Sequence, residues 1–323
     1  MLVGGMFAAA AVAAGPADAA GLTDARAWLA SIHAAARERN YEGTMVFTAG
    51  GVSSSSRVSH FCLGDQYFEQ VESLDGRMQR VLRHNDIVQT VWPQRKTAVI
   101  ESRNAGGGPR SLTPSVDPRA LDQYELKPEG RERVAGREAQ VFLLQPRDAL
   151  RYAQRLWADL ASGLMLRADV IGPANAVIES VAFSALEVGV KPQPELVLQA
   201  MKIADGYRVL RPTLQPTQLD AEGWALPRPV PGFAQTGCVK RSLETATESR
   251  SGPVLQAVFS DGLTHVSLFI EAFDARRHRA PLHGQIGATG TLAQRRGEHW
   301  ITVMGDVPPA TLKLFADALE RQR

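Results

Sequence analysis

Apolar and polar residues alternate along much of the chain between residues 41 and 186, and this two-residue period predicts half-buried β-strands. The clearest case runs from Tyr152 to Ile171, which we interpret as a strand, a tight turn and a second strand. Gly163 falls where that turn requires a positive φ, which costs little for a residue without Cβ. Further strands are predicted over residues 41–49, 57–63, 66–73, 78–84, 87–92, 96–101, 132–134, 140–144 and 176–186.

Helical periodicity is rarer. A first amphipathic helix is expected to begin at Thr23, as its N-cap, and to end at Asn40. A short helical piece is expected over residues 118–124, a helix over 194–201, and another over 312–319. The chain is therefore predicted to be built mainly of strands, with a few helices.

Two stretches interrupt the pattern. Residues 102–118 are rich in Gly, Pro and Ser and predict a flexible loop. Residues 207–231 contain five prolines, which argue against regular structure and indicate a linker. After it the strand pattern returns, over residues 254–259, 266–273 and 301–303.

These elements predict a mainly β chain with some α: a large unclosed antiparallel β-barrel followed by a small α+β domain. About nine or ten strands with short local connections favour an open barrel or a strongly curved sheet over a sandwich. The domains are predicted as residues 21–206 for the barrel, 207–231 for the linker and 232–323 for the small domain.

Residues 1–20 are almost wholly apolar or small, and they predict a signal peptide. Ala17, Asp18 and Ala19 fit the small-x-small rule of signal peptidase. No Lys or Arg precedes the apolar run, so a start site placed too far downstream or a short buried helix are the alternatives.

The chain has 323 residues and a net charge of +2, a balance too weak to indicate a nucleic-acid partner. Cys62 and Cys238 are its two cysteines. In an oxidising compartment they would form one disulfide between the domains. The interpretation we favour is two separate buried thiols, each acting as a small apolar side chain.

The search for catalytic motifs is negative. Ser260, Asp261 and His265 bring suggestive residue types together, but they lie on one predicted hairpin turn, where Ser and Asp bond locally. His278 and His283 have no carboxylate or thiol pattern to complete a metal site, and a solvated loop is the expected setting. We therefore predict no catalytic residue, no metal, no cofactor and no enzyme activity.

Two features are candidates for binding. The concave side of the large sheet would take up a lipid if helices do not fill it, and plain core packing is the alternative. Its candidate lining residues are Met45, Phe47, Phe61, Trp92 and Trp157.

The second feature is a basic cluster in the small domain, formed by Arg276, Arg277 and Arg279. Arginine binds carboxylates and phosphates through a planar fork, so the cluster suits an acidic peptide or a lipid head group. A solvated loop surface is the alternative.

Four stretches together resemble the MucB/RseB family of periplasmic regulators of the envelope-stress sigma factor. They are NYEGTMVF at 40–47, RLWADLASGLMLRADVI at 155–171, VFSDGLTHVSLFIEAFD at 258–274 and ITVMGDVPPATLKLFADAL at 301–319. None of them is catalytic, and their order and spacing over both domains carry the resemblance.

The resemblance implies a large domain similar to the LolA/LolB lipoprotein carriers and a periplasmic protein that regulates negatively. Such a protein binds the periplasmic domain of a membrane anti-sigma factor of the RseA/MucA type and shields it from proteolysis. Lipid or lipopolysaccharide fragments loosen that complex. A periplasmic lipoprotein or lipid carrier is the alternative function, and whether the chain forms a homo-oligomer is left open.

Overall fold

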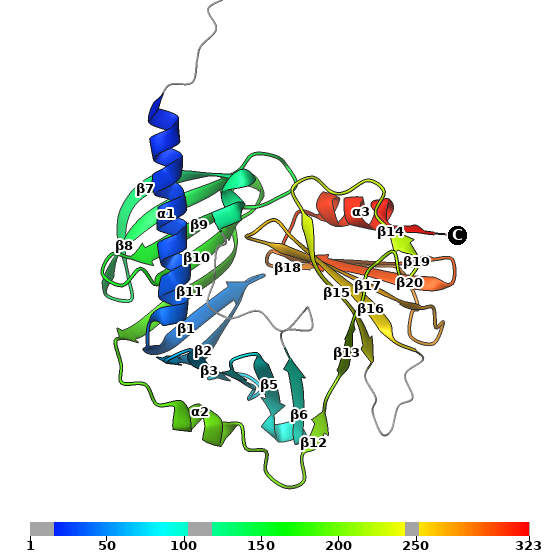
Figure 1. Ribbon diagram of the computed structural model, residues 1–323, viewed down its shortest axis with the longest axis horizontal. Coiled ribbons are helices and arrows are strands. Elements are labelled where there is room, and N and C mark those ends of the chain that lie inside the picture. Colours follow the sequence, from blue (N-terminus) through cyan, green and yellow to red (C-terminus); the bar gives the residue numbers. More distant parts are fainter. Residues whose placement is uncertain (1–15, 103–117, 243–251, 323) are drawn as a thin grey trace, which may run out of the picture.

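The computed structural model describes residues 16–102, 118–242 and 252–322, with the backbone alone for residues 16–24 and 118 (Figure 1). The predicted flexible loop at 102–118 and the first fifteen residues of the predicted signal peptide lie almost wholly outside the described residues. The described chain forms a twelve-stranded sheet, a seven-stranded sheet and a small two-stranded sheet.

The large sheet is open, with β12 at one edge and β7 at the other. Its strands pair in the order β12-β6-β5-β4-β3-β2-β1-β11-β10-β9-β8-β7, all antiparallel except β12 with β6. Its strands are β1 (Tyr41–Ala49), β2 (Val52–Leu63), β3 (Gln66–Ser73), β4 (Arg80–His84), β5 (Ile87–Trp92), β6 (Thr97–Ser102), β7 (Tyr124–Val134), β8 (Arg137–Pro146), β9 (Ala153–Asp159), β10 (Met165–Ile171), β11 (Val177–Val188) and β12 (Arg208–Leu210). The predicted large unclosed antiparallel sheet is confirmed.

The hairpin of β9 and β10 has the predicted turn. Gly163 has φ +76°, and a Cβ built there would lie 3.3 Å from the Cβ of Ala35. The carboxylate of Asp159 accepts a hydrogen bond from the backbone N–H of Ser162 at 3.0 Å, which fixes the turn locally. Glycine is therefore required here both for conformation and for the close approach of a helix.

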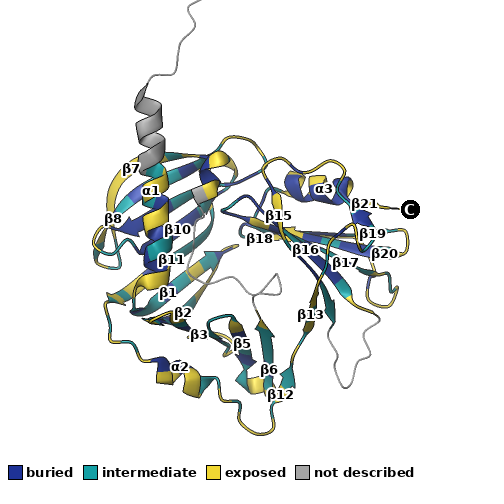
Figure 2. Ribbon diagram, viewed as in Figure 1, coloured by how far each residue is buried: buried dark blue, intermediate teal, exposed yellow. Residues whose placement is uncertain are grey.

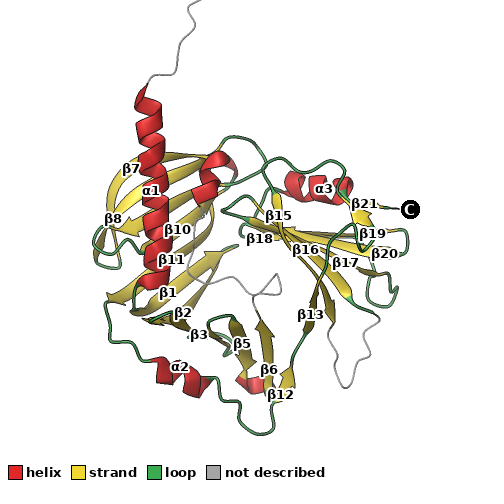
Figure 3. Cartoon of the chain, in the orientation of Figure 1, coloured by secondary structure: helices red, strands yellow, loops and turns green. Residues whose placement is uncertain are grey.

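Two helices cover opposite faces of the large sheet (Figure 3). Ala35 of α1 (Pro16–Glu38) packs with Tyr41 of β1, whereas Val197 of α2 (Pro194–Ala200) packs with Phe61 of β2. His60 is the cross-strand partner of Tyr41, so the next residue, Phe61, points to the other face.

The start of α1 differs from the prediction. The helix begins at Pro16, and Thr23 lies inside it instead of capping it. Proline is well suited to a first helical turn, and the Ala-rich stretch that follows contains no strong helix breaker. The expected helix over 194–201 is confirmed as α2, and the piece expected over 118–124 is a 3-10 helix at Pro118–Asp122.

The seven-stranded sheet carries α3 (Pro309–Ala318) on one face (Figure 2). Leu312 and Phe315 of α3 belong to the same buried cluster as Leu268 and Val303 of the sheet. The strand order is β13-β15-β16-β17-β20-β19-β18. Its strands are β13 (Thr213–Pro216), β15 (Ala234–Ser242), β16 (Val254–Ser260), β17 (His265–Ala272), β18 (Leu282–Ile286), β19 (Thr289–Arg296) and β20 (His299–Gly305). This sheet and α3 form the predicted small α+β unit.

The proline-rich stretch at 207–231 is more regular than predicted. It contains β12, β13 and also β14 (Trp224–Ala225), which pairs with β21 (Glu320–Arg321). Of the five prolines only Pro216 lies in a strand, at the end of β13. Proline is tolerated there because β13 is an edge strand, where one side of the strand needs no hydrogen-bond donors.

Candidate functional site where the two sheets meet

The turn between β16 and β17 is held by its own polar side chains. One carboxylate oxygen of Asp261, Oδ1, accepts the backbone N–H groups of Leu263 at 2.9 Å and Thr264 at 2.8 Å. The hydroxyl of Ser260 donates to the carbonyl of Thr264 at 2.9 Å. This is the local bonding that the sequence predicts for Ser and Asp here, and it gives Ser260 and Asp261 a structural role in the turn.

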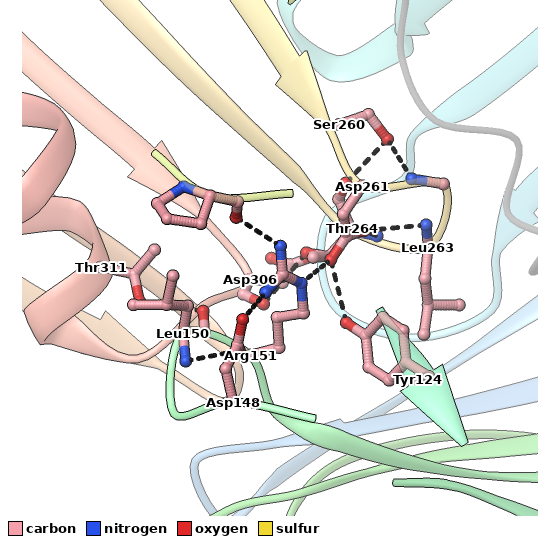
Figure 4. A network of polar contacts seen from close by, with 12 residues as sticks. Tyr124, Asp148, Leu150, Arg151, Ser260, Asp261, Leu263, Thr264, Asp306 and Thr311 are labelled. Atoms are coloured by element: carbon pink, nitrogen blue, oxygen red, sulfur yellow. Dashed lines mark hydrogen bonds and ion pairs between the residues drawn. The ribbon is translucent and has the colours of Figure 1, made fainter. Parts of the chain in front are cut away.

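The other oxygen of Asp261, Oδ2, bonds to the large sheet (Figure 4). It accepts hydrogen bonds from the phenol hydroxyl of Tyr124 at 3.1 Å and from Nε of Arg151 at 2.7 Å. The side chains of Arg151 and Asp261 are both 0% exposed. Arg151 also pairs with Asp148 and donates to the carbonyl of Pro231 at 2.8 Å. A buried charge needs this degree of pairing, because an unpaired one is strongly destabilising.

Tyr124 completes this network from the edge strand β7. Burial raises the pKa of its phenol well above the ordinary value, and the nearby negative charge of Asp261 raises it further. The phenol therefore stays protonated and donates to the carboxylate at neutral pH.

Further contacts join the two sheets around this network. Thr311 donates from its hydroxyl to the carbonyl of Leu150 at 2.9 Å, and the backbone N–H of Ala288 donates to Glu179 at 3.1 Å. A Cβ built at Gly262 would lie 2.8 Å from the backbone nitrogen of Ala120, so only glycine permits this approach. The junction is thus closely packed as well as ion-paired.

The predicted basic cluster lies in the loop between β17 and β18 and is partly neutralised. Arg276 is an ion-pair partner of Asp274 at 3.3 Å, and Arg277 pairs with Glu271. Arg279 is exposed and makes no ion pair with any described residue. The loop keeps a net positive charge, but two of its three arginines are already paired with acidic side chains.

His278 in the same loop is buried, in contrast to the solvated setting predicted for it. Its ring stacks on Trp300 with centroids 4.8 Å apart, and Nδ1 accepts the backbone N–H of Asp274 at 3.0 Å. Within the described residues, no group of three or more His, Cys, Asp or Glu side chains has the geometry of a metal site.

The five candidate lipid contacts are not brought together. Met45, Phe47 and Trp92 lie on the face of the large sheet that α1 covers, as the register of β1 to β5 shows. Phe61 and Trp157 lie on the opposite face, packed in two separate clusters. Of the first three, Met45 is buried and Phe47 is 41% exposed. Lipid binding on the α1 face stays a prediction.

A surface pocket that the sequence does not reveal lies in the smaller unit. It has a volume of about 440 Å³ and is lined mainly by apolar residues of the stretch before β15, including Trp224, Val230 and Phe233. The strands of the large sheet contribute no residue to its lining. It is therefore distinct from the predicted lipid site.

The two cysteines are free thiols, as the favoured interpretation predicts, but only Cys238 is buried, whereas Cys62 is half-buried. Cys238 lies in the hydrophobic core of the seven-stranded sheet, and burial raises the pKa of its thiol to about 11. The thiol of Cys62 donates to the carbonyl of Arg37 at 2.6 Å. No helix among the described residues has the length and apolar character needed to span a bilayer.

Sequence reasoning did not find Arg151 and Tyr124 as partners of Asp261. Arg151 lies at the start of the central hairpin stretch, and nothing around it in the sequence distinguishes this buried arginine from those at the surface. The one usable signal is the Asp-Gly turn at 261–262, which identifies Asp261 as a structural residue but gives no information on its second partner.

Comparison with protein families gives matches over both parts of the chain. The MucB/RseB N-terminal domain matches residues 24–202, and the MucB/RseB C-terminal domain matches residues 218–320. The sigma factor AlgU regulatory protein MucB of Pseudomonas aeruginosa is 27% identical, with 91% of this chain and 90% of that protein covered. The sigma-E factor regulatory protein RseB of Escherichia coli is 23% identical over the same shares.

Solved structures are similar over the same length. The structure of the Pseudomonas aeruginosa MucA/MucB complex matches with a TM-score of 0.70 and 25% identity, covering 93% of this chain and 99% of that one. A crystal structure of MucB alone matches with a TM-score of 0.65 and 24% identity, covering 93% and 98%.

Proposed function

The chain belongs to the MucB/RseB family, and we propose that it regulates a sigma factor by binding the periplasmic segment of a membrane anti-sigma factor. The relatives that match are regulatory proteins of AlgU and sigma-E, which is a binding role and not an enzymatic one. We place the protein in the periplasm, with residues 1–20 as its signal peptide, 21–206 and 232–323 as its domains and 207–231 as the linker.

One observation carries this proposal: the similarity extends over both sheets. The match to MucB in the complex with MucA covers 93% of this chain, and so it includes the seven-stranded sheet and α3. A carrier of lipids or lipoproteins would need only the large curved sheet. The second unit, joined to the first by a buried ion pair, fits a protein that presents one continuous surface to a partner.

Binding would also explain negative regulation. A segment of the anti-sigma factor that is bound to this surface is inaccessible to a protease, so the sigma factor stays bound and inactive. A lipid or lipopolysaccharide fragment that binds better to the free regulator must weaken the complex. By linkage, the anti-sigma factor must weaken lipid binding by the same factor.

Calorimetric titration tests this function. The chain from residue 21 onward is titrated with the periplasmic segment of the anti-sigma factor from the same genome, alone and with lipopolysaccharide fragments present. We expect saturable binding that the fragments weaken. Binding that they leave unchanged would remove the lipid switch, and no binding in either condition would favour the lipoprotein or lipid carrier.

A further inference from the structure

The two large sheets have four edges, and three of them are protected against pairing with another chain. β12 is three residues long, and β13 is flanked by Pro212 and ends in Pro216. β7 has a bulge between Pro128 and Gly130. It also carries six charged residues: Glu125, Lys127, Glu129, Arg131, Glu132 and Arg133. Short length, proline, bulges and charge are the devices by which proteins prevent strand addition at an edge.

The fourth edge, β18, has only one of these devices, the proline at position 281 just before its first residue, and its register with β19 contains no bulge. Its sequence is Leu-His-Gly-Gln-Ile, without proline or a permanently charged residue, and all five residues are exposed. Leu282 is 54% exposed and Ile286 is 73% exposed, although both are aliphatic. An exposed edge strand with apolar side chains is a template for another strand.

The register shows which backbone groups this edge offers. β18 and β19 are joined by a two-residue turn with Gly287 at φ +59°, and Ile286 and Thr289 are the closing pair. In such a turn the closing pair is hydrogen-bonded, and bonded pairs then alternate along the strand. The N–H and C=O groups of His283 and Gln285 are therefore directed away from β19, toward the free edge.

The surroundings of β18 join two regions of the molecule. β18 begins at Leu282, shortly after Arg279, the exposed arginine of the basic loop that makes no ion pair with any described residue. At its other end a Cβ built at Gly287 would lie 2.7 Å from the Cβ of Ala49 in β1, so the strand ends against the large sheet (Figure 1). A chain bound along β18 would pass from the basic loop to the junction of the sheets.

We propose that β18 is the docking edge for an extended segment of the anti-sigma factor, which adds an eighth strand to the seven-stranded sheet. The identity of this partner rests on the function proposed above. The segment would bond through its backbone to His283 and Gln285 and place apolar side chains against Leu282 and Ile286. An acidic residue at its end would meet Arg279.

A proline at position 283 tests the proposal. His283→Pro removes the outward N–H and adds a ring on the edge that the partner uses, while the bonds of Leu282, Gly284 and Ile286 to β19 remain. His283→Ala is the matched control, because it removes the imidazole but keeps the N–H. Titration with peptides tiling the periplasmic segment of the anti-sigma factor should show binding weakened about tenfold or more by proline. The alanine control should be within about twofold of the wild type.

Hydrogen exchange gives a readout at single residues. In the free protein the amides of His283 and Gln285 should exchange fast and those of Gly284 and Ile286 slowly, and the bound peptide should protect the first pair. Peptide binding that is equal in the proline variant and the wild type, both folded by circular dichroism, would overturn the β18 site while leaving the proposed function intact. No peptide binding to the wild type would instead overturn the function.

The same experiment separates a second copy of the chain from the proposed partner. If the wild type self-associates, if His283→Pro makes it monomeric, and if peptide affinity is unchanged, then β18 pairs copies of this chain and the proposal is wrong.

Discussion

Two arginine–carboxylate pairs in this protein have similar chemistry and opposite surroundings. Arg151 and Asp261 join the two sheets with both side chains 0% exposed, whereas in the basic loop the side chain of Arg276 is 90% exposed and that of its partner Asp274 is 16% exposed. Backbone and side-chain hydrogen bonds from Arg276 lower the pKa of Asp274, so the exposed pair is ionised as well. Both contacts are arginine–carboxylate ion pairs, and burial decides what each pair does.

Burial makes the first pair structural. Removing one partner of a buried pair leaves a charge without solvent or counter-ion, whereas an exposed pair exchanges its partner for water at little cost. The loop arginines can therefore exchange their acidic partners within this chain for acidic groups of a binding partner, whereas Arg151 cannot. The comparison predicts that the same kind of substitution has unequal effects at the two sites.

The largest expected effect is that of Arg151→Met on stability. Methionine keeps length and apolar contact but leaves the carboxylate of Asp261 buried without its cation, so the free energy of unfolding should fall by about 3 kcal/mol. Arg276→Met is the matched control and should change it by less than about 0.5 kcal/mol. Urea unfolding of both variants measures the difference. Equal losses would show that burial does not distinguish the two pairs.

A double variant sharpens this explanation. In Arg151→Met/Asp261→Asn no charge remains at the network's centre, and the amide oxygen of asparagine can still accept the N–H groups of Leu263 and Thr264. We expect it to regain about 1–2 kcal/mol relative to Arg151→Met alone. If the stability losses of the two single substitutions simply add in the double variant, measured by the same urea unfolding, then the unpaired charge of Asp261 is not the cause of the loss in Arg151→Met.

The exposed loop should affect binding more than stability. Replacing Arg276, Arg277 and Arg279 by glutamate should weaken binding of the anti-sigma segment about tenfold, and the wild-type affinity should fall as salt is raised. The thermal unfolding midpoint serves as the control and should change little. Unchanged affinity in the variant would remove the basic cluster from the partner surface.

The contrast between the two pairs also shows what the sequence could and could not predict. Strand alternation, the Asp-Gly turn and the glycine at 163 are local signals, and the elements predicted from them are present in the structure. The bond from Arg151 to Asp261 joins residues 110 positions apart. No periodicity within a window of ten or twenty residues carries information on such a pair.

The prediction of lipid-lining residues was limited for the same reason, because it also depends on contacts between distant parts of the chain. Alternation shows that neighbouring residues of a strand point to opposite faces of the sheet. Which residues point to which face depends on how the strand pairs with strands distant in the sequence. Trp157 reads as a lining residue, yet it lies on the face away from α1, with the guanidinium of Arg167 4.5 Å from its ring. Composition alone does not reveal that an aromatic residue is covered by a charged side chain.

The smallest effect belongs to Tyr124→Phe, which removes one hydrogen bond to Asp261 and leaves the ion pair in place. The free energy of unfolding should fall by about 1 kcal/mol at pH 8. Because the pKa of Tyr124 is raised in the folded protein, its contribution is complete below the ordinary phenol pKa of 10.0 and is lost as the pH rises further. The stability gap between wild type and variant should therefore narrow above pH 10 in unfolding experiments. A gap that stays constant at alkaline pH would mean that the phenol is not held protonated against the buried carboxylate, and that the network depends on Arg151 alone.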